Sequence, residues 1–321
     1  MSDTMDICGL KAERGQKLQT YIPVLDSNTK IPITIINGQN DGPTLLITAG
    51  IHGGEYPGIA AAIEISQAIE PEVISGCLII IHPVNIRSFW ERSAFVTPDD
   101  GKNLNREFPG DVNGTLSQKT AWLLSRHFFP LADFYADLHS GDIHEELYPY
   151  VYYPGLPNSE ISAKAREVAL VLDMKFMVRS TATTGAYNYA AISGVPSLLI
   201  ERGGAGLCRR EDIDAYKNDL HNILCKLELL CSPQQQQKHT PVDVTDVIYL
   251  ETDQAGCWFS SCRCGGDKIK QGDKLGYLTD LFGNTITVYN AEQDGIILYQ
   301  CSALAAPKGT ILVTYGKVKN N

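Results

Sequence analysis

Between about residues 17 and 230, short apolar runs alternate with longer helical patterns, and this alternation constrains the fold more than any other feature. The runs at 44–48, 77–81 and 197–200 show no polar–apolar alternation, so both faces of each predicted strand should be covered. Such strands separated by helices form a largely parallel sheet. The pattern predicts an α/β fold with a mixed, largely parallel sheet and helices on both faces.

The remaining elements of this region follow from the same periodicities and from capping residues. Further strands are predicted at 17–25, 30–36, 134–138 and 150–153. Helices are predicted at 57–69, at 117–129 with Ser117 as N-cap, at 158–172 with Asn158 or Ser159 as cap, and at 211–230.

The pattern of apolar, polar and glycine residues changes after residue 231. The segment SPQQQQKHTP at 232–241 is short, polar and flanked by prolines, which is typical of a linker. Residues 242–318 contain short β-rich runs broken by glycines and no convincing helix, which indicates a small all-β domain. We therefore predict two domains, residues 1–235 and 240–321.

Composition narrows the class of partner. The formal net charge of −10 disfavours nucleic acid and anionic membrane, because both reward a basic surface. No stretch approaches 18 uninterrupted apolar residues, so no membrane span is expected. Nine scattered cysteines without a secretion signal indicate reduced thiols, and a cytoplasmic protein is expected.

Three polar positions follow the predicted buried strands. His52 and Glu55 lie three residues apart in TAGIHGGEYPG, where Gly53 and Gly54 allow the chain to turn. His139 lies just past the strand at 134–138, and period-two geometry places Asp137 on the same side, where it could orient a metal ligand. Glu201 directly follows the strand at 197–200. Taken singly, the histidine positions are better explained as ordinary loop or strand-end residues, and Glu201 is either a solvated loop residue or a placed functional group.

Their coincidence at the carboxyl ends of buried strands favours a site, because ligands of open α/β sheets bind in the crevice there. Two histidines and one glutamate, His52, His139 and Glu55, leave the fourth position of a zinc ion for water, the pattern of a catalytic site. Zinc suits this donor set better than magnesium or calcium, which need more oxygens. Glu201 is then available as the general base that takes the proton of the water.

A fourth motif, DGKNLNREFPG at 100–110, concentrates polar side chains between glycines. Arg106 could bind a substrate carboxylate in a bidentate manner, and Asn105 could add a donor. A surface turn is the alternative interpretation.

The motifs HGGE, DGKNLNREFPG, DLHSGD and IERGG, in this order between residues 31 and 206, resemble the succinylglutamate desuccinylase/aspartoacylase family, within the wider zinc carboxypeptidase-like fold. The resemblance implies one zinc ion on His52, Glu55 and His139, a substrate carboxylate held by Asn105 and Arg106, and Glu201 as the residue that activates water. It also implies an upstream arginine that polarises the scissile carbonyl, for which Arg92 is the candidate and Arg87 the fallback.

The C-terminal segments GGDKIKQGDKLGYLTDLFGN and YNAEQDGIILY resemble a β-barrel of the biotinyl/lipoyl-carrier type. The turn AEQDGI lacks the lysine to which carriers attach their cofactor, so no biotin or lipoate is predicted. Tyr187, on a predicted loop before the Glu201 strand, either reaches the substrate or is an ordinary loop residue.

These observations predict a zinc-dependent hydrolase that cleaves the amide bond of an N-acylated amino acid or related small amine. Two alternatives stay open: a zinc carboxypeptidase that acts on a short peptide, and a non-catalytic binding module that contains a structural metal. The acyl group, the amine and the oligomeric state, a homo-oligomer included, are left open by the sequence.

Overall fold

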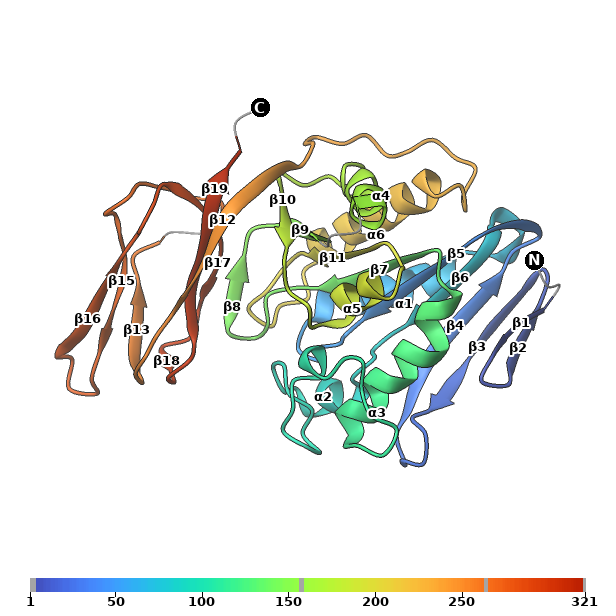
Figure 1. Cartoon of the computed structure of the whole chain (residues 1–321), viewed down its shortest axis with the longest axis horizontal. Coiled ribbons are helices and arrows are strands. Elements are labelled where there is room, and N and C mark those ends of the chain that lie inside the picture. The colour runs from blue at the N-terminus through green and yellow to red at the C-terminus, as the bar shows by residue number, and fades with distance from the viewer. Residues whose placement is uncertain (1–3, 156–158, 263–264, 320–321) are drawn as a thin grey trace.

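A mixed sheet of 13 strands runs through the computed structural model, which describes residues 4–155, 159–262 and 265–319 (Figure 1). Its strands are β3 (Gln16–Pro23), β4 (Lys30–Asn37), β5 (Asn40–Ala49), β6 (Ser75–Ile81), β7 (Phe134–His139), β8 (Glu145–Leu147), β9 (Tyr150–Pro154), β10 (Phe176–Ser180), β11 (Ser197–Glu201), β12 (Val242–Glu251), β14 (Lys268–Ile269), β17 (Gly295–Cys301) and β19 (Ile311–Val318). The order across the sheet is β14-β17-β19-β12-β10-β9-β11-β7-β5-β6-β4-β3, and β8 pairs with β17.

The centre of the sheet is parallel, as the uninterrupted apolar runs predict. Strands β6, β5, β7 and β11 lie side by side and pair in parallel, and their apolar side chains are buried. The neighbouring β9 runs antiparallel to β11, and β3 and β4 are antiparallel at the far edge. The mixed α/β fold expected from the sequence is confirmed.

Six helices cover the two faces of the sheet in the described part of the chain (Figure 1). They are α1 (Tyr56–Ala68), α2 (Ile86–Glu91), α3 (Leu116–Leu123), α4 (Ser159–Ala169), α5 (Ala186–Ile192) and α6 (Arg210–Lys226). Successive residues of β5 point to opposite faces. Leu45 and Ile47 pack with α1, α4 and α6 in one core cluster, whereas Leu46 packs with α3 and α5 in another.

The predicted helix at 117–129 differs from the structure at both ends. Thr115, not Ser117, is the N-cap of α3, and its backbone N–H donates to Gln118 Oε1 at 3.1 Å. Ser117 is instead held by Asp100, which accepts its backbone N–H at 2.8 Å. After Leu123 the chain continues as a π-helical turn, Leu124–Phe128, and a 3-10 turn, Phe129–Leu131.

Several short elements escaped the sequence analysis: α2, α5, β8, β10 and the N-terminal hairpin of β1 (Thr4–Ile7) and β2 (Leu10–Glu13). Short 3-10 turns also occur at Pro71–Val73 and Leu104–Arg106. The proposed cap Asn158 lies outside the described residues, and the side chain of Ser159 is likewise not described. No helix that the structure describes combines the length and the apolar character needed to cross a membrane.

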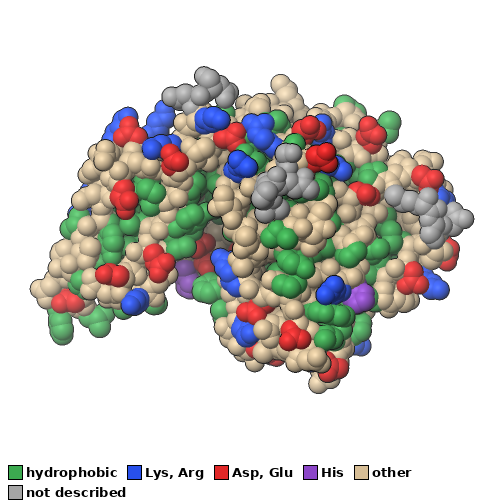
Figure 2. Space-filling view, in the orientation of Figure 1, with side chains coloured by type: hydrophobic (Ala, Val, Ile, Leu, Met, Phe, Trp, Pro, Cys, Tyr) green, Lys and Arg blue, Asp and Glu red, His purple; other side chains and the backbone are tan. Residues whose placement is uncertain are grey.

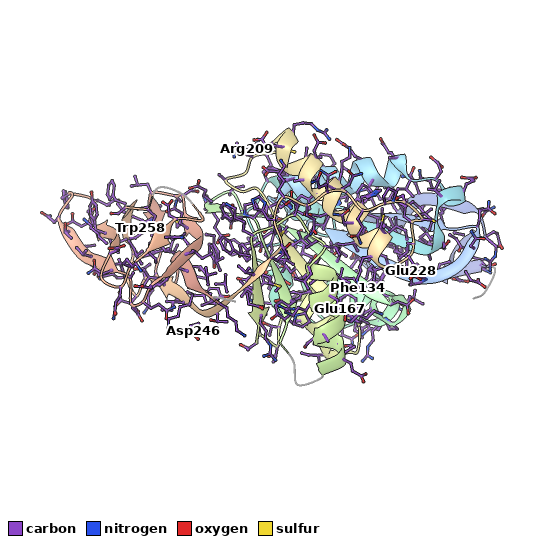
Figure 3. All side chains as sticks on the ribbon, turned by 90° about the horizontal axis from the view of Figure 1, so that it is seen from above. Phe134, Glu167, Arg209, Glu228, Asp246 and Trp258 are labelled. Atoms are coloured by element: carbon purple, nitrogen blue, oxygen red, sulfur yellow. The ribbon has the colours of Figure 1, made fainter. Side chains whose placement is uncertain are left out.

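The C-terminal region is all-β across its described residues. Besides the strands that extend the large sheet, it has a four-stranded sheet of β16 (Thr285–Asn290), β15 (Lys274–Thr279), β13 (Gly256–Ser260) and β18 (Ala305–Ala306). Trp258, which is labelled in Figure 3, and Leu278 of this sheet pack with Leu312 and Tyr315 of β19 in a separate core. The parallel pairing of β10 with β12 joins this region to the central sheet.

Strand register places the predicted site residues together. Glu201, the last residue of β11, is the direct neighbour of His139, the last residue of β7. The adjacent β5 ends at Ala49, and the chain then passes through His52 and Glu55 into α1. The carboxyl ends of three neighbouring parallel strands therefore meet at one edge, where open α/β sheets bind their ligands.

Candidate active site

The loop between β5 and α1 brings His52 against Glu55. Glu55 is the N-cap of α1 and is 3% exposed, and His52 Nδ1 lies 2.7 Å from its Oε1. Neither Gly53 nor Gly54 has the positive φ that a sharp glycine turn would need. Gly53 is instead required by close packing, because a Cβ there would lie 2.2 Å from the backbone nitrogen of Phe89.

The second histidine reaches the same carboxylate from β7. His139 Nδ1 lies 3.0 Å from Glu55 Oε2, which also accepts the backbone N–H of Ser140 at 3.1 Å. The two imidazole rings meet edge to face with their centres 5.0 Å apart. One ligand atom from each of His52, Glu55 and His139 lies within 4.8 Å of the others, so these three side chains could hold a metal ion.

Each histidine is oriented by an oxygen on its far side. His139 Nε2 lies 3.0 Å from Asp137 Oδ2, and Asp137 in turn accepts a hydrogen bond from Thr48 Oγ1 at 2.7 Å. His52 Nε2 lies 3.1 Å from Asn103 Oδ1. An acceptor on Nε2 keeps the proton there and leaves Nδ1 free to bind a metal, as is usual for histidine ligands. The orienting contact predicted for Asp137 is present.

The donor chemistry of this cluster fits a zinc ion. Two imidazole nitrogens and one carboxylate form the three-ligand set of catalytic zinc sites, which leaves a position open. In the absence of metal, burial raises the pKa of Glu55, but the charges and hydrogen bonds of His139 and His52 outweigh it and hold the pKa at about 2. Glu55 is therefore ionised over the whole physiological range, as a metal ligand must be.

Glu201 faces this cluster with a free oxygen. Among the residues that the structure describes, no donor reaches its Oε2, although the atom is buried. Burial raises the pKa of Glu201 well above its usual range; the charge of His139 opposes this, and the carboxylates of Glu55 and Glu145 add to it. An unpartnered carboxyl with a raised pKa can accept and return a proton near neutral pH.

The strand ends that carry His139 and Glu201 are tied to α6. The hydroxyl of Tyr216 donates to the carbonyl of His139 and accepts the backbone N–H of Arg202 at 3.1 Å. Arg202 forms a buried ion pair with Asp219, with Nε 2.5 Å from Oδ2. The arginine of IERGG thus anchors the strand end instead of reaching the cavity.

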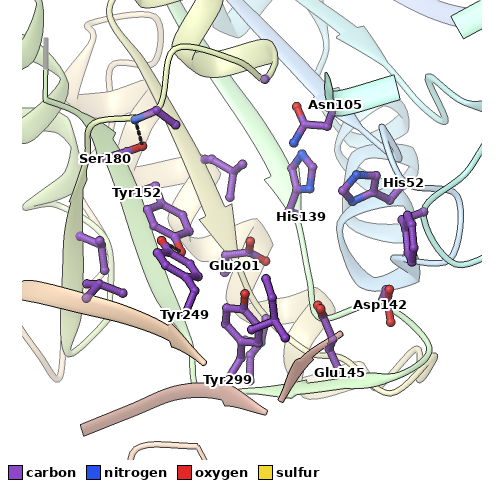
Figure 4. Close-up of a pocket in the computed structure, with 18 of the residues that line it drawn as sticks. His52, Asn105, His139, Asp142, Glu145, Tyr152, Ser180, Glu201, Tyr249 and Tyr299 are labelled. Carbon is purple, nitrogen blue, oxygen red and sulfur yellow. Dashed lines mark hydrogen bonds between the residues drawn. The ribbon is translucent and has the colours of Figure 1, made fainter. Parts of the chain in front are cut away.

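Asn105 and Arg106 lie beside the cluster on the 3-10 turn Leu104–Arg106, and both line the cavity. Asn105 Oδ1 accepts the backbone N–H of Ala186 at 2.9 Å, which leaves its amide nitrogen directed toward the cavity (Figure 4). Arg106 forms no ion pair with any carboxylate of the described chain, and its Nη1 donates to the carbonyl of Asn105 at 3.3 Å. Its guanidinium is thus available to an anion.

The cluster opens into a cavity of about 1230 Å³ between the α/β region and the C-terminal strands. The hollow and the acidic and histidine side chains within it are visible on the surface (Figure 2). Tyr152 and Tyr249, whose hydroxyls are 3.1 Å apart, form one wall, and Tyr299 forms another (Figure 4). Tyr187 also lines the cavity, but it lies in α5 and not on the loop expected for it.

Arg92 is not brought to the site. It is exposed at the C-cap of α2 with φ of 54°, and it does not belong to the cavity wall formed by the described residues. The fallback Arg87 forms surface ion pairs with Glu91 and Asp99. The arginines that do line the cavity are Arg106 and Arg179.

Sequence reasoning missed several residues of the cavity: Asn103, Asp142, Glu145, Arg179, Tyr152, Tyr249 and Tyr299. Asn103 and Asp142 belong to motifs that were recognised, so their positions carried a usable signal. Tyr249 and Tyr299 come from β12 and β17, and no local pattern links these C-terminal strands to the motifs of the site.

The fold and the site define an α/β protein with a histidine–glutamate cluster at the carboxyl edge of its sheet. The chain belongs to the succinylglutamate desuccinylase/aspartoacylase family, because residues 41–227 match the succinylglutamate desuccinylase/aspartoacylase catalytic domain. The family resemblance of the four motifs is thereby confirmed.

Individual proteins resemble this chain in sequence or in fold. An N-alpha-acetyl-L-2,4-diaminobutyric acid deacetylase of Halomonas elongata is 29% identical over 280 residues, which cover 83% of this chain and 80% of that protein. A succinylglutamate desuccinylase/aspartoacylase of Rhodobacter sphaeroides has the same fold, with a TM-score of 0.83 and 24% identity over 95% of this chain and 96% of that one. A product-bound ectoine utilization protein of Ruegeria pomeroyi gives a TM-score of 0.84 at 24% identity, over 94% and 95% of the two chains.

Proposed function

We propose that this chain is a zinc-dependent deacylase that hydrolyses the amide bond of an N-acylated amino acid. The observation that carries the proposal is the convergence of His52, Glu55 and His139, with the unpartnered carboxyl of Glu201 facing the same cavity. Membership of an amide-hydrolase family supports the reaction type, and the deacetylase relative supports an acyl group on nitrogen.

The residues of the chain then take separate roles. His52, Glu55 and His139 would hold one zinc ion, which when bound supplies Lewis acidity that activates water and polarises a carbonyl. Glu201 accepts the proton of the attacking water and later delivers it to the leaving nitrogen. Asp137 and Asn103 keep the two imidazoles oriented.

Substrate positioning falls to the polar residues beside the cluster. Arg106, which has no carboxylate partner in the described chain, binds the substrate carboxylate, and the amide nitrogen of Asn105 adds a hydrogen bond. Tyr187 contributes a buried part of the wall. We give Arg92 no role at the carbonyl, because its side chain lies outside the cavity.

We also retain the proposed division into a catalytic unit, residues 1–235, and a C-terminal unit, residues 240–321, of barrel-sandwich type. The two packed sheets around Trp258 and Leu312 support such a C-terminal unit. A cytoplasmic location remains our expectation.

The test is replacement of the base. Glu201→Gln keeps the shape of the side chain but cannot take a proton, so we expect unchanged zinc content and a loss of turnover of about 10²–10⁴-fold. Zinc is measured by elemental analysis, and hydrolysis by free-amine release from a panel of N-acyl amino acids. The exposed Glu72 gives a matched control, and Glu72→Gln should keep full activity.

Two results would contradict the proposal. Full activity of Glu201→Gln would remove Glu201 as the base. Stoichiometric zinc without hydrolysis of any N-acyl amino acid would remove the deacylase; short peptides in the same panel then distinguish a carboxypeptidase from a binding module.

A further inference from the structure

The metal cluster and the base are carried by the ends of neighbouring strands. His139 ends β7, Glu201 ends β11, and the two residues are direct partners in the sheet. Figure 4 shows both side chains projecting from these strand ends. Because each side chain is short relative to the strand that carries it, the distance between the imidazole and the carboxyl depends on how the last rung of the sheet is held.

That last rung is stretched, and a tyrosine hydroxyl occupies it. The backbone N–H of Arg202 donates to the carbonyl of His139 at 3.3 Å, just beyond the usual range for such a bond. The hydroxyl of Tyr216 accepts the same N–H at 3.1 Å and donates to the same carbonyl. It also lies 3.0 Å from the carbonyl oxygen of Ile200. One phenol oxygen thus contacts both strands at the point where they end.

Tyr216 is held in this place by α6. It is fully buried in the core cluster, and Asp219, three residues further along the helix, lies on the same side. Asp219 forms the buried ion pair with Arg202 and accepts the backbone N–H of Asp173 at 3.1 Å. Arg202 donates through Nη2 to the carbonyl of Asp173 at 2.9 Å. These contacts fix the helix against the strand ends, so the hydroxyl has little freedom to leave the rung.

Packing alone does not require this hydroxyl. The aromatic ring fills the core with or without its oxygen, and without it the amide of Arg202 still has the carbonyl of His139 as a partner. The oxygen acts as a spacer, because the ladder bond cannot shorten while a third group shares both of its ends. The spacer reaches Glu201 from both sides, since the phenol contacts the backbone of the residue before it and of the residue after it.

We propose that Tyr216 is a positioning residue that sets the separation between the metal ligand His139 and the base Glu201. This inference rests on the proposed deacylase function. Tyr216 does not belong to the cavity wall formed by the described residues, so it acts through the backbone of the two strand ends and not on the substrate. Catalytic groups need to be held within about 0.5 Å of the productive geometry, and a misplacement of about 1 Å costs about 10²-fold in rate.

Tyr216→Phe tests the role, because it removes one oxygen and keeps the ring in the core. In the zinc-loaded variant we expect kcat to fall about 10–100-fold while KM stays within about twofold of wild type, since Arg106 and Asn105 still hold the substrate. All three ligand side chains remain, so the zinc content per chain should be unchanged. Kinetics are measured with the substrate that the wild-type protein hydrolyses fastest in the panel of N-acyl amino acids.

Tyr153→Phe is the matched control. Tyr153 is 6% exposed, belongs to the same core cluster as Tyr216 and donates its hydroxyl to Asp243 at 2.7 Å. It is not part of the cavity wall in the described chain. Both variants lose a buried hydroxyl hydrogen bond, so both should lower Tm. Only Tyr216→Phe should lower kcat, and this difference separates positioning from a general loss of stability.

Crystal structures of the metal-free protein provide a measurement without turnover. In Tyr216→Phe we expect the distance from Arg202 N to His139 O to shorten from 3.3 Å toward the usual value of about 2.9 Å. The carboxyl group of Glu201 should shift by at least about 0.5 Å relative to the ring of His139. Tyr153→Phe should show neither change.

The outcomes separate the positioning role from the reaction. Wild-type kcat in Tyr216→Phe, or an equal loss of kcat in Tyr153→Phe, would overturn the role of Tyr216 and leave the deacylase intact. If the wild-type protein hydrolyses no N-acyl amino acid, the deacylase proposal fails and the crystal structures decide the role by themselves. Unchanged strand ends in Tyr216→Phe would then overturn it, and a shortened rung with a displaced Glu201 would support it.

Discussion

The two walls of the cavity have different origins. One wall, which we call the motif wall, carries the histidine–glutamate cluster. It comes from motifs at the ends of adjacent parallel strands, and His52 and Glu55 are only three residues apart. The opposite wall, which we call the assembled wall, combines residues from distant parts of the chain. Tyr249 and Tyr299 come from the C-terminal strands, and Glu145 is positioned by pairing with β17. The comparison suggests that the chemistry resides in the motif wall and the choice of substrate in the assembled wall.

The largest effect is expected when a metal ligand is removed from the motif wall, and this tests whether that wall carries the chemistry. His139→Ala should abolish zinc binding and lower kcat by at least about 10³-fold. It removes one of the three ligands, a buried side chain at the end of β7. Zinc content and amine release are measured together.

His127 offers a control of the same residue type. It lies on the π-helical turn, edge-on to Trp122 and away from the cavity wall that the described residues form. His127→Ala should retain one zinc per chain. Zinc retained by His139→Ala would show that the cluster is not the metal site.

The second prediction concerns the contact behind the ligand. Asp137 is fully buried and holds His139 Nε2, so Asp137→Asn should weaken zinc binding about 10–100-fold without abolishing it. Competition with a chelator measures the affinity. Asp133, which accepts the backbone N–H of Thr44 at 2.8 Å near the start of β7, gives the control Asp133→Asn, with unchanged affinity expected. Equal losses in both variants would indicate a general effect on β7.

The motif wall was predictable because its geometry is local. A buried strand fixes the direction of its last side chain, and neighbouring parallel strands end at one edge, so the sequence alone was enough to place His139 and Glu201 together. The same reasoning found Asp137, two residues before His139. Arg92 was suggested by the family resemblance and not by strand geometry; it is the exposed C-cap of α2, a short helix that the sequence pattern did not reveal.

The assembled wall could not be predicted in this way. Glu146 and Gln300, which hydrogen-bond where β8 meets β17, are 154 residues apart, and a three-residue strand carries no periodic signal. Tyr249 had an additional ambiguity, since it is 47% exposed and resembles an ordinary surface residue of β12. Such residues become candidates only when the register between distant strands is known.

A smaller effect tests the contribution of the C-terminal strands to catalysis. Tyr249→Phe removes the hydroxyl contact with Tyr152, so kcat/KM should fall about 2–10-fold while Tm changes little. Tyr277 lies on β15, stacked on Phe259 with ring centres 5.1 Å apart, and gives the control Tyr277→Phe, with unchanged kinetics. Equal kinetics for Tyr249→Phe and wild type would confine this tyrosine to a structural role.

The smallest effect is on stability and follows from the pKa of Glu145, which burial and then the charges of Asp142 and Glu55 raise. Its pKa is about 8 in the folded chain and 4.5 as an ordinary glutamate, so the folded state binds the proton more tightly. Stability therefore falls as pH rises from 4.5 through 8, and the whole loss is present above pH 8. Glu145→Gln removes this loss, so its Tm in the metal-free protein should match wild type near pH 4.5 and exceed it at pH 9. Glu146→Gln should show no such pH-dependent gain, and a Tm difference for Glu145→Gln that stays constant with pH would mean that the carboxyl already has a compensating partner.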